Sequence, residues 1–142
     1  MFTAFIALQN ISSKVVKDLG FKNLGFVCIA VIYLVFTVSA SFAPRIVKKL
    51  GDRTTLILSS LCYVFYAVSF IFPVYRFELE ADGQDVSSFI YSDAFITTTL
   101  IAFAALTGLG AGPLWVGATN FIAECATEEL KGFYNSLFLG IF

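Results

Sequence analysis

Long runs of uncharged, mostly apolar residues alternate with short polar stretches along the chain. Two of these runs, residues 24–43 and 55–74, are of similar length, and a third covers residues 94–123. An α-helix of about twenty residues is about 30 Å long, which matches the hydrocarbon core of a bilayer. The pattern therefore predicts three helices that cross a membrane completely.

Shorter apolar segments lie at both ends, residues 1–13 and 132–142. Each is too short to span a bilayer, so we expect the end of one helix and the start of another. The predicted fold class is an all-α integral membrane protein with a single membrane domain. It has about three full spans and an incomplete helix at each end. A chain of 142 residues holds about four spans, so we expect a fragment of a larger membrane protein or a short subunit that needs partners.

Prolines predict where these helices end or bend. Pro44 follows the first complete run and is expected to stop that helix, leaving residues 44–54 as a loop. Pro113 lies inside the run over residues 94–123, which is about 45 Å long as a helix and exceeds the membrane core. A kink near Gly112 and Pro113 is therefore predicted.

The polar stretches differ in charge. Residues 75–93 carry five acidic side chains against Arg76 alone, and they predict a solvated acidic loop. The loop over residues 44–54 is basic, with Asp52 as its one acid. Its basic residues are Arg45, Lys48, Lys49 and Arg53. Basic residues gather in cytoplasmic loops of membrane proteins, so we expect this loop to face the cytoplasm.

Composition and charge narrow the function. Hydrophobic residues make up 58% of the chain, charged residues 13%, and the net charge is −1. This balance excludes a basic nucleic-acid binder and predicts the lipid bilayer as the surroundings. Histidine is absent, which excludes an imidazole metal site and a catalytic triad. No nucleophile–base pair, metal cluster or phosphate loop is found, so we expect no enzyme activity, no metal and no cofactor.

A glycine-rich block, Gly-Leu-Gly-Ala-Gly-Pro at residues 108–113, invites a dinucleotide-binding interpretation. The G-x-G-x-x-G motif fails because its last position is Pro113, and the block lies in an apolar span rather than a strand–turn–helix unit. Small residues instead recur every four positions at Ala104, Gly108 and Gly112. This spacing predicts a helix-packing ridge that lets another helix approach closely.

Polar groups at membrane depth are the candidates for a cavity or transport pathway. They are Gln9, Asn10, Trp115, Asn120 and Glu124. Hydrogen bonds between helices are the alternative role for the amides. The three predicted spans contain no Asp, Glu, Lys or Arg, so the sequence gives no support for proton coupling.

Several segments occur in the order typical of one family. The most specific is Gly-Leu-Gly-Ala-Gly-Pro-Leu-Trp at residues 108–115; the others are residues 8–13, 24–25, 33, 39–44, 46–51, 62–63 and 70–73. On these residues the chain resembles the Unc-ninety-three (UNC-93) family, the ion-channel regulatory branch of the major facilitator superfamily. The resemblance implies a twelve-helix protein in two six-helix halves. This chain would supply the end of helix one through the start of helix five.

The Gly51-Asp52-Arg53 tripeptide resembles the loop between helices two and three of facilitator transporters. In those proteins the loop is cytoplasmic and braces the inner gate. The resemblance implies that Asp52 pairs with basic groups and a nearby helix N-terminus.

The resemblance favours a membrane protein that regulates an ion channel, such as a potassium channel, or another membrane partner through helix contacts. One alternative is a facilitator-type transporter of a small solute or ion, with Gln9, Asn120 and Glu124 lining its pathway. Another is a structural accessory subunit of a membrane complex.

Overall fold

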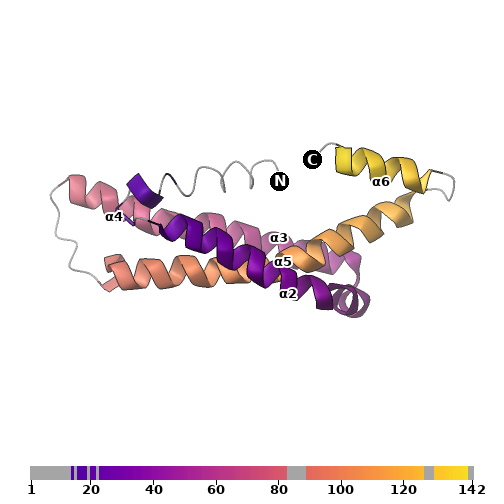
Figure 1. Ribbon diagram of the computed structural model, residues 1–142, viewed down its shortest axis with the longest axis horizontal. Coiled ribbons are helices and arrows are strands. Elements are labelled where there is room, and N and C mark those ends of the chain that lie inside the picture. Colours follow the sequence, from indigo (N-terminus) through magenta and orange to yellow (C-terminus); the bar gives the residue numbers. More distant parts are fainter. Residues whose placement is uncertain are drawn as a thin grey trace.

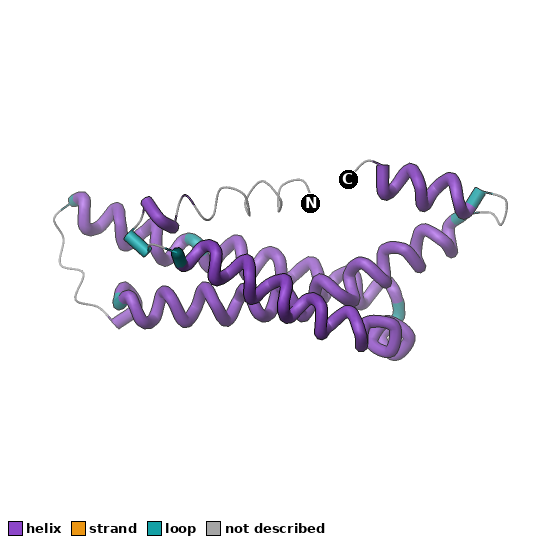
Figure 2. Tube along the Cα trace, in the orientation of Figure 1, coloured by secondary structure: helices purple, strands orange, loops and turns teal. Residues whose placement is uncertain are grey.

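The computed structural model describes residues 14, 16–18, 20–21, 23–82, 89–126 and 130–140. These residues form helices joined by short connections, and no strand occurs among them (Figures 1 and 2). The elements are α2 (Leu24–Leu50), α3 (Asp52–Ser69), α4 (Ile71–Ala81), the short 3₁₀-helix η1 (Phe89–Tyr91), α5 (Asp93–Cys125) and α6 (Lys131–Gly140).

Within the described part of the chain, three stretches are long and apolar enough to cross a membrane. They are Leu24–Leu50, Asp52–Ala81 and Asp93–Cys125. The expected fold class, an all-α integral membrane protein, is therefore confirmed. The predicted partial helix over residues 1–13 lies outside the described residues.

Helix α5 is the centre of the arrangement. It packs along α2 on one side and along α3 on the other, whereas α2 and α3 contact each other at few positions. Figure 1 shows the three helices side by side, with α5 changing direction along its length. The bend has an identifiable cause, because Pro113 lies inside this continuous helix.

The main core lies where α2, α3 and the first half of α5 meet. Tyr66, Ile96 and Leu100 are fully buried there, and Tyr66 packs edge-on against Phe70 with 5.1 Å between ring centroids. The outer faces of α2 and α3 expose large apolar side chains, among them Leu34 and Ile57. A helix that is apolar all round is typical of a membrane span.

The expectation that Pro44 stops the first helix is wrong. Helix α2 continues through Pro44 to Leu50. A proline removes one backbone hydrogen bond, and membrane helices tolerate this loss where other groups or water meet the freed carbonyl. Lys48 and Lys49 occupy the last turn, where positive charge suits the helix dipole. The predicted loop shrinks to Gly51, whose φ of +80° turns the chain directly into α3.

The expectation of an acidic loop over residues 75–93 is also wrong in its first part. Residues 75–81 belong to α4, which begins after a break at Phe70. Pro73 occupies the first turn of α4, where its missing N–H costs the helix nothing, although it withholds a donor from the end of α3. An ion pair between Arg76 and Glu80, one turn apart, supports the new helix.

Two further helical segments begin at positions that the apolar runs alone do not mark. Lys14 and residues 16–18, which precede the first long apolar run, are helical, and Val16 is buried in the main core. Helix α5 begins after Ser92, whose hydroxyl accepts a hydrogen bond from the Phe95 N–H at 3.2 Å. This is an N-cap, which satisfies a backbone donor that the first turn leaves unpaired.

Candidate functional site at the proline bend of α5

Gly108, Gly110 and Gly112 let α5 lie close between α2 and α3. Residues two positions apart in an α-helix point to nearly opposite sides of it. A Cβ at Gly108 would lie 2.6 Å from the carbonyl oxygen of Ile32 in α2, and a Cβ at Gly112 would lie 2.7 Å from the backbone nitrogen of Ala40. A Cβ at Gly110 would lie 3.1 Å from Cys62 Cβ in α3. Their missing side chains therefore permit close approach on both sides.

The bend itself leaves one backbone carbonyl without its helical donor. Pro113 has no N–H, so the carbonyl of Leu109, four residues earlier, lacks the usual hydrogen bond. The hydroxyl of Ser39 in α2 donates to this oxygen at 2.6 Å. Gly112 leaves the space for that contact, since a Cβ there would lie 2.8 Å from Ser39 Oγ. A hydroxyl from the neighbouring helix thus replaces the donor that the proline removes.

A second hydroxyl connects α5 to α3 on the other side. Thr107 Oγ1 lies 2.9 Å from the carbonyl oxygen of Phe103 in its own helix and 3.2 Å from that of Cys62 in α3. Thr107 is fully buried, as is Ala104 one turn earlier. Hydroxyl groups therefore hold the middle of α5 against both neighbouring helices.

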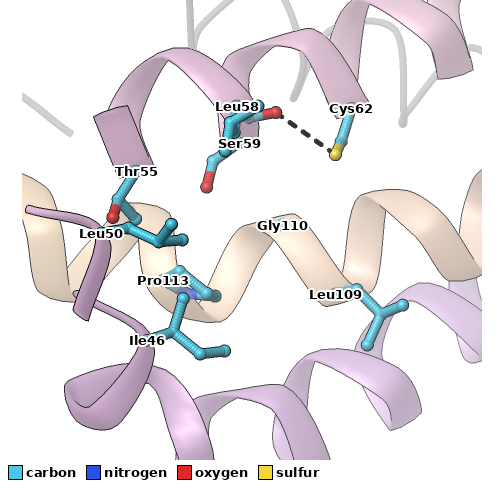
Figure 3. A pocket seen from close by; sticks show the side chains of 9 residues that line it. All are labelled: Ile46, Leu50, Thr55, Leu58, Ser59, Cys62, Leu109, Gly110 and Pro113. Carbon is cyan, nitrogen blue, oxygen red and sulfur yellow. Dashed lines mark hydrogen bonds between the residues drawn. The ribbon is translucent and has the colours of Figure 1, made fainter. Parts of the chain in front are cut away.

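A cleft of about 200 Å³ opens beside the bend (Figure 3). Its walls come from the end of α2, the first three turns of α3 and the bend of α5. The lining residues are Ile46, Leu50, Thr55, Leu58, Ser59, Cys62, Leu109, Gly110 and Pro113. Thr55 and Cys62 donate to carbonyls of their own chain segment, those of Gly51 and Leu58. The cleft therefore presents mainly apolar surface, which suits a hydrocarbon group rather than a polar substrate.

The predicted packing ridge faces the interior of this chain. Ala104, Gly108 and Gly112 are buried, and the close neighbours of both glycines belong to α2. Since α2 occupies this surface, the ridge is not open to another protein.

The structure describes three of the five predicted pathway residues, and these three are not gathered into one site. Asn120 and Glu124 are exposed on successive turns near the end of α5, whereas Trp115 is half-buried and one turn or more away. Gln9 and Asn10 lie outside the described residues.

The predicted cytoplasmic-loop residues meet at the corner between α2 and α3. Arg45, Lys48 and Lys49 are exposed in the last turns of α2, and Arg53 is exposed in the first turn of α3. Asp52 is half-buried, and its Oδ1 has no hydrogen-bond partner within the described part of the chain.

Sequence reasoning missed Ser39, Thr107 and Arg76. In the sequence Ser39 and Thr107 look like ordinary small residues of a membrane span. Only the folded arrangement brings Ser39 to Leu109. The sequence does distinguish Arg76, because it is the one basic residue in the acidic stretch over residues 75–93. It forms ion pairs with Glu80 at 2.8 Å and with Asp93, and its guanidinium lies 5.7 Å from the centre of the Phe21 ring.

Comparison with known proteins supports the resemblance to the UNC-93 family. A family model described as "Ion channel regulatory protein UNC-93" matches residues 21–81, the stretch that contains α2, α3 and α4. The chain is UNC-93-like. Together with its apolar helices, this makes the UNC-93-like chain a multi-pass integral membrane protein of the expected fold class.

Curated relatives extend the likeness to α5 and α6. "Protein unc-93 homolog A" of Xenopus laevis is 31% identical over 135 residues, which cover 93% of this chain and 24% of the relative. "UNC93-like protein MFSD11" of Xenopus tropicalis is 28% identical over 141 residues, covering 97% of this chain and 27% of the relative. The UNC-93-like chain thus spans about a quarter of the length of the curated relatives it matches. No solved structure matches it.

Proposed function

We propose that the UNC-93-like protein regulates an ion channel through contacts between membrane helices, with a potassium channel as the first candidate partner. The observation that carries this proposal is the match of residues 21–81 to a family described as ion channel regulatory. That description is not an enzyme activity, and we propose none for this protein.

The contact surface we propose is the outer face of α2. The small-residue ridge of α5 is occupied by α2, which leaves the outward faces for a partner. Phe26 and Leu34 of α2 are 62% and 67% exposed, and both lie within the stretch that matches the family model. Lipid tails are as apolar as the helices, so the hydrophobic effect does not drive helices together in a membrane. Association of α2 with a partner helix would depend on complementary side-chain packing.

The experiment is co-expression of the protein with individual potassium channels, with current measured per channel at the cell surface. Leu34→Trp changes the shape of the proposed contact face and keeps it apolar. Ile57→Trp is the matched control, since Ile57 is 63% exposed on α3. We expect Leu34→Trp to abolish the change in current and Ile57→Trp to retain it. Equal effects of the two variants, or no effect of the wild-type protein on any channel, would contradict the proposal.

We also propose that the corner containing residues 44–54 faces the cytoplasm, because four basic residues gather there. Lys49→Cys, in a variant whose native cysteines Cys28, Cys62 and Cys125 are replaced, tests this orientation. In intact cells a membrane-impermeant maleimide should not label the new cysteine, and permeabilisation should allow labelling. Labelling in intact cells would show that this corner faces the opposite side of the membrane.

Transport of a small solute is a second candidate, favoured by one observation. Asn120 and Glu124 are exposed one turn apart on α5, and polar side chains of membrane helices usually face water or a partner. Flux into liposomes that falls with Asn120→Leu, but not with Phe121→Leu on the adjacent position, would support transport. Absence of flux would leave a regulatory or structural accessory role.

A further inference from the structure

The corner between α2 and α3 carries a dense group of exposed positive charges. Arg45, Lys48, Lys49 and Arg53 are exposed there, and the single-residue turn at Gly51 brings the two helix ends together. No carboxylate lies within ion-pair distance of any of the four in the part of the chain that the structure describes. Asp52 is the one acid among residues 44–54, and one of its oxygens is buried beneath this surface. The corner is therefore an exposed cationic surface.

The apolar cleft beside the bend of α5 begins at the same corner. Ile46 and Leu50 line the cleft and lie in the same turns of α2 as the basic residues. Leu58 on α3 and the buried Pro113 on α5 also line the cleft (Figure 3). A cationic surface thus adjoins an apolar cleft of about 200 Å³ at the end of membrane-spanning helices.

We propose that this corner binds an anionic phospholipid, with the phosphate on the basic side chains and part of one acyl chain in the cleft. Clusters of Lys and Arg next to the end of a membrane helix attract anionic headgroups. Hydrocarbon is the matching occupant for the cleft, because aliphatic side chains and Pro113 form most of its wall. Of its three polar side chains, Thr55, Ser59 and Cys62, two already donate to backbone carbonyls.

The juxtaposition of charge and cleft distinguishes this site from a simple anion site. A free phosphate would use only the basic surface and gain nothing from Ile46, Leu50 and Leu58. A phospholipid uses both features at once. Its acyl chain would also contact Pro113 and Leu109, so binding would bear directly on the bend of α5. The inference does not depend on the proposed regulation of a channel.

The test is native mass spectrometry of the protein purified from vesicles that contain equal amounts of phosphatidylserine and phosphatidylcholine. We expect the wild-type protein to retain phosphatidylserine preferentially. Lys48→Gln with Lys49→Gln should lower the ratio of phosphatidylserine to phosphatidylcholine, by up to about fivefold for each charge removed. Lys17→Gln, at an exposed lysine outside the corner, should leave the ratio unchanged.

A second variant separates the lipid from a free anion. Leu58→Trp enlarges a side chain that lines the cleft and leaves every basic residue in place, and we expect it to lower phosphatidylserine retention. Leu34→Trp is its control, since Leu34 is exposed on α2 and does not line the cleft. Circular dichroism of each variant should show unchanged helix content.

Three results would overturn the proposal. The first is equal retention of the two lipids by the wild-type protein. The second is a phosphatidylserine preference that survives Leu58→Trp, which would mean attraction by surface charge alone. The third is displacement of phosphatidylserine by inorganic phosphate, which would mean a site for free anions.

Discussion

Pro44 and Pro113 both lie inside membrane helices, but their surroundings differ. Pro113 is buried and directly follows Gly112, and the carbonyl that it deprives of a donor accepts a hydrogen bond from the hydroxyl of Ser39 in another helix. Pro44 is exposed near the basic end of α2, where water and headgroups can supply donors. In this protein the buried proline thus couples two helices, whereas we expect the exposed one to affect only its own helix.

The largest effect is expected where the buried bend depends on a missing side chain. Gly112→Ala places a Cβ 2.7 Å from the backbone nitrogen of Ala40, and backbone cannot move aside cheaply. We expect the free energy of unfolding in detergent to fall by about 1–3 kcal/mol. Gly132→Ala is the control, because a Cβ there meets nothing within 4 Å. That variant should be neutral or raise the stability by up to about 1 kcal/mol through helix propensity. Equal losses of stability in Gly112→Ala and Gly132→Ala would show that the close contact of Gly112 with α2 does not determine the effect.

The next effect concerns the hydroxyl that completes the bend. Ser39→Ala leaves the Leu109 carbonyl without its donor, and we expect a loss of about 1–2 kcal/mol in unfolding free energy. Ser41→Ala is the matched control on the same helix, since its exposed hydroxyl bonds only to Thr37 of its own helix at 3.5 Å. Its cost should stay below about 0.5 kcal/mol. A similar loss for both serines would show that Ser39 has no special role.

The smallest effect is expected at the exposed proline. Pro44→Ala restores a backbone donor in a solvated part of α2, so we expect a change within about 0.5 kcal/mol in chemical unfolding. The phospholipid preference of the neighbouring corner should also persist. A change as large as that of Gly112→Ala would mean that both prolines couple helices, and the contrast between them would fail.

The sequence predicts the parts of this fold that depend on local pattern. Apolar run length identifies the regions of α2, α3 and α5, and Pro113 predicts the bend. The rule that proline ends a helix fails at Pro44, because α2 tolerates the loss of one backbone hydrogen bond there and continues to Leu50. Residues 75–81 were expected as a loop from their charge, yet Arg76 and Glu80 have the spacing of a helical ion pair.

The candidate site is less predictable because it is made by tertiary contacts. Ser39 and Leu109 are 70 positions apart, and nothing local to either reveals the hydrogen bond between them. The small-residue ridge is visible in the sequence, but its partner is not. Only the packing shows that α2 lies against Gly108 and Gly112.

The most direct test of the coupled bend is a double-mutant cycle between Ser39 and Pro113. Pro113→Ala restores the backbone N–H that serves the Leu109 carbonyl, so Ser39 should then be dispensable. We predict that Ser39→Ala costs about 1–2 kcal/mol of unfolding free energy with Pro113 present and close to nothing with Pro113→Ala. The same cost of Ser39→Ala in both backgrounds would contradict the account.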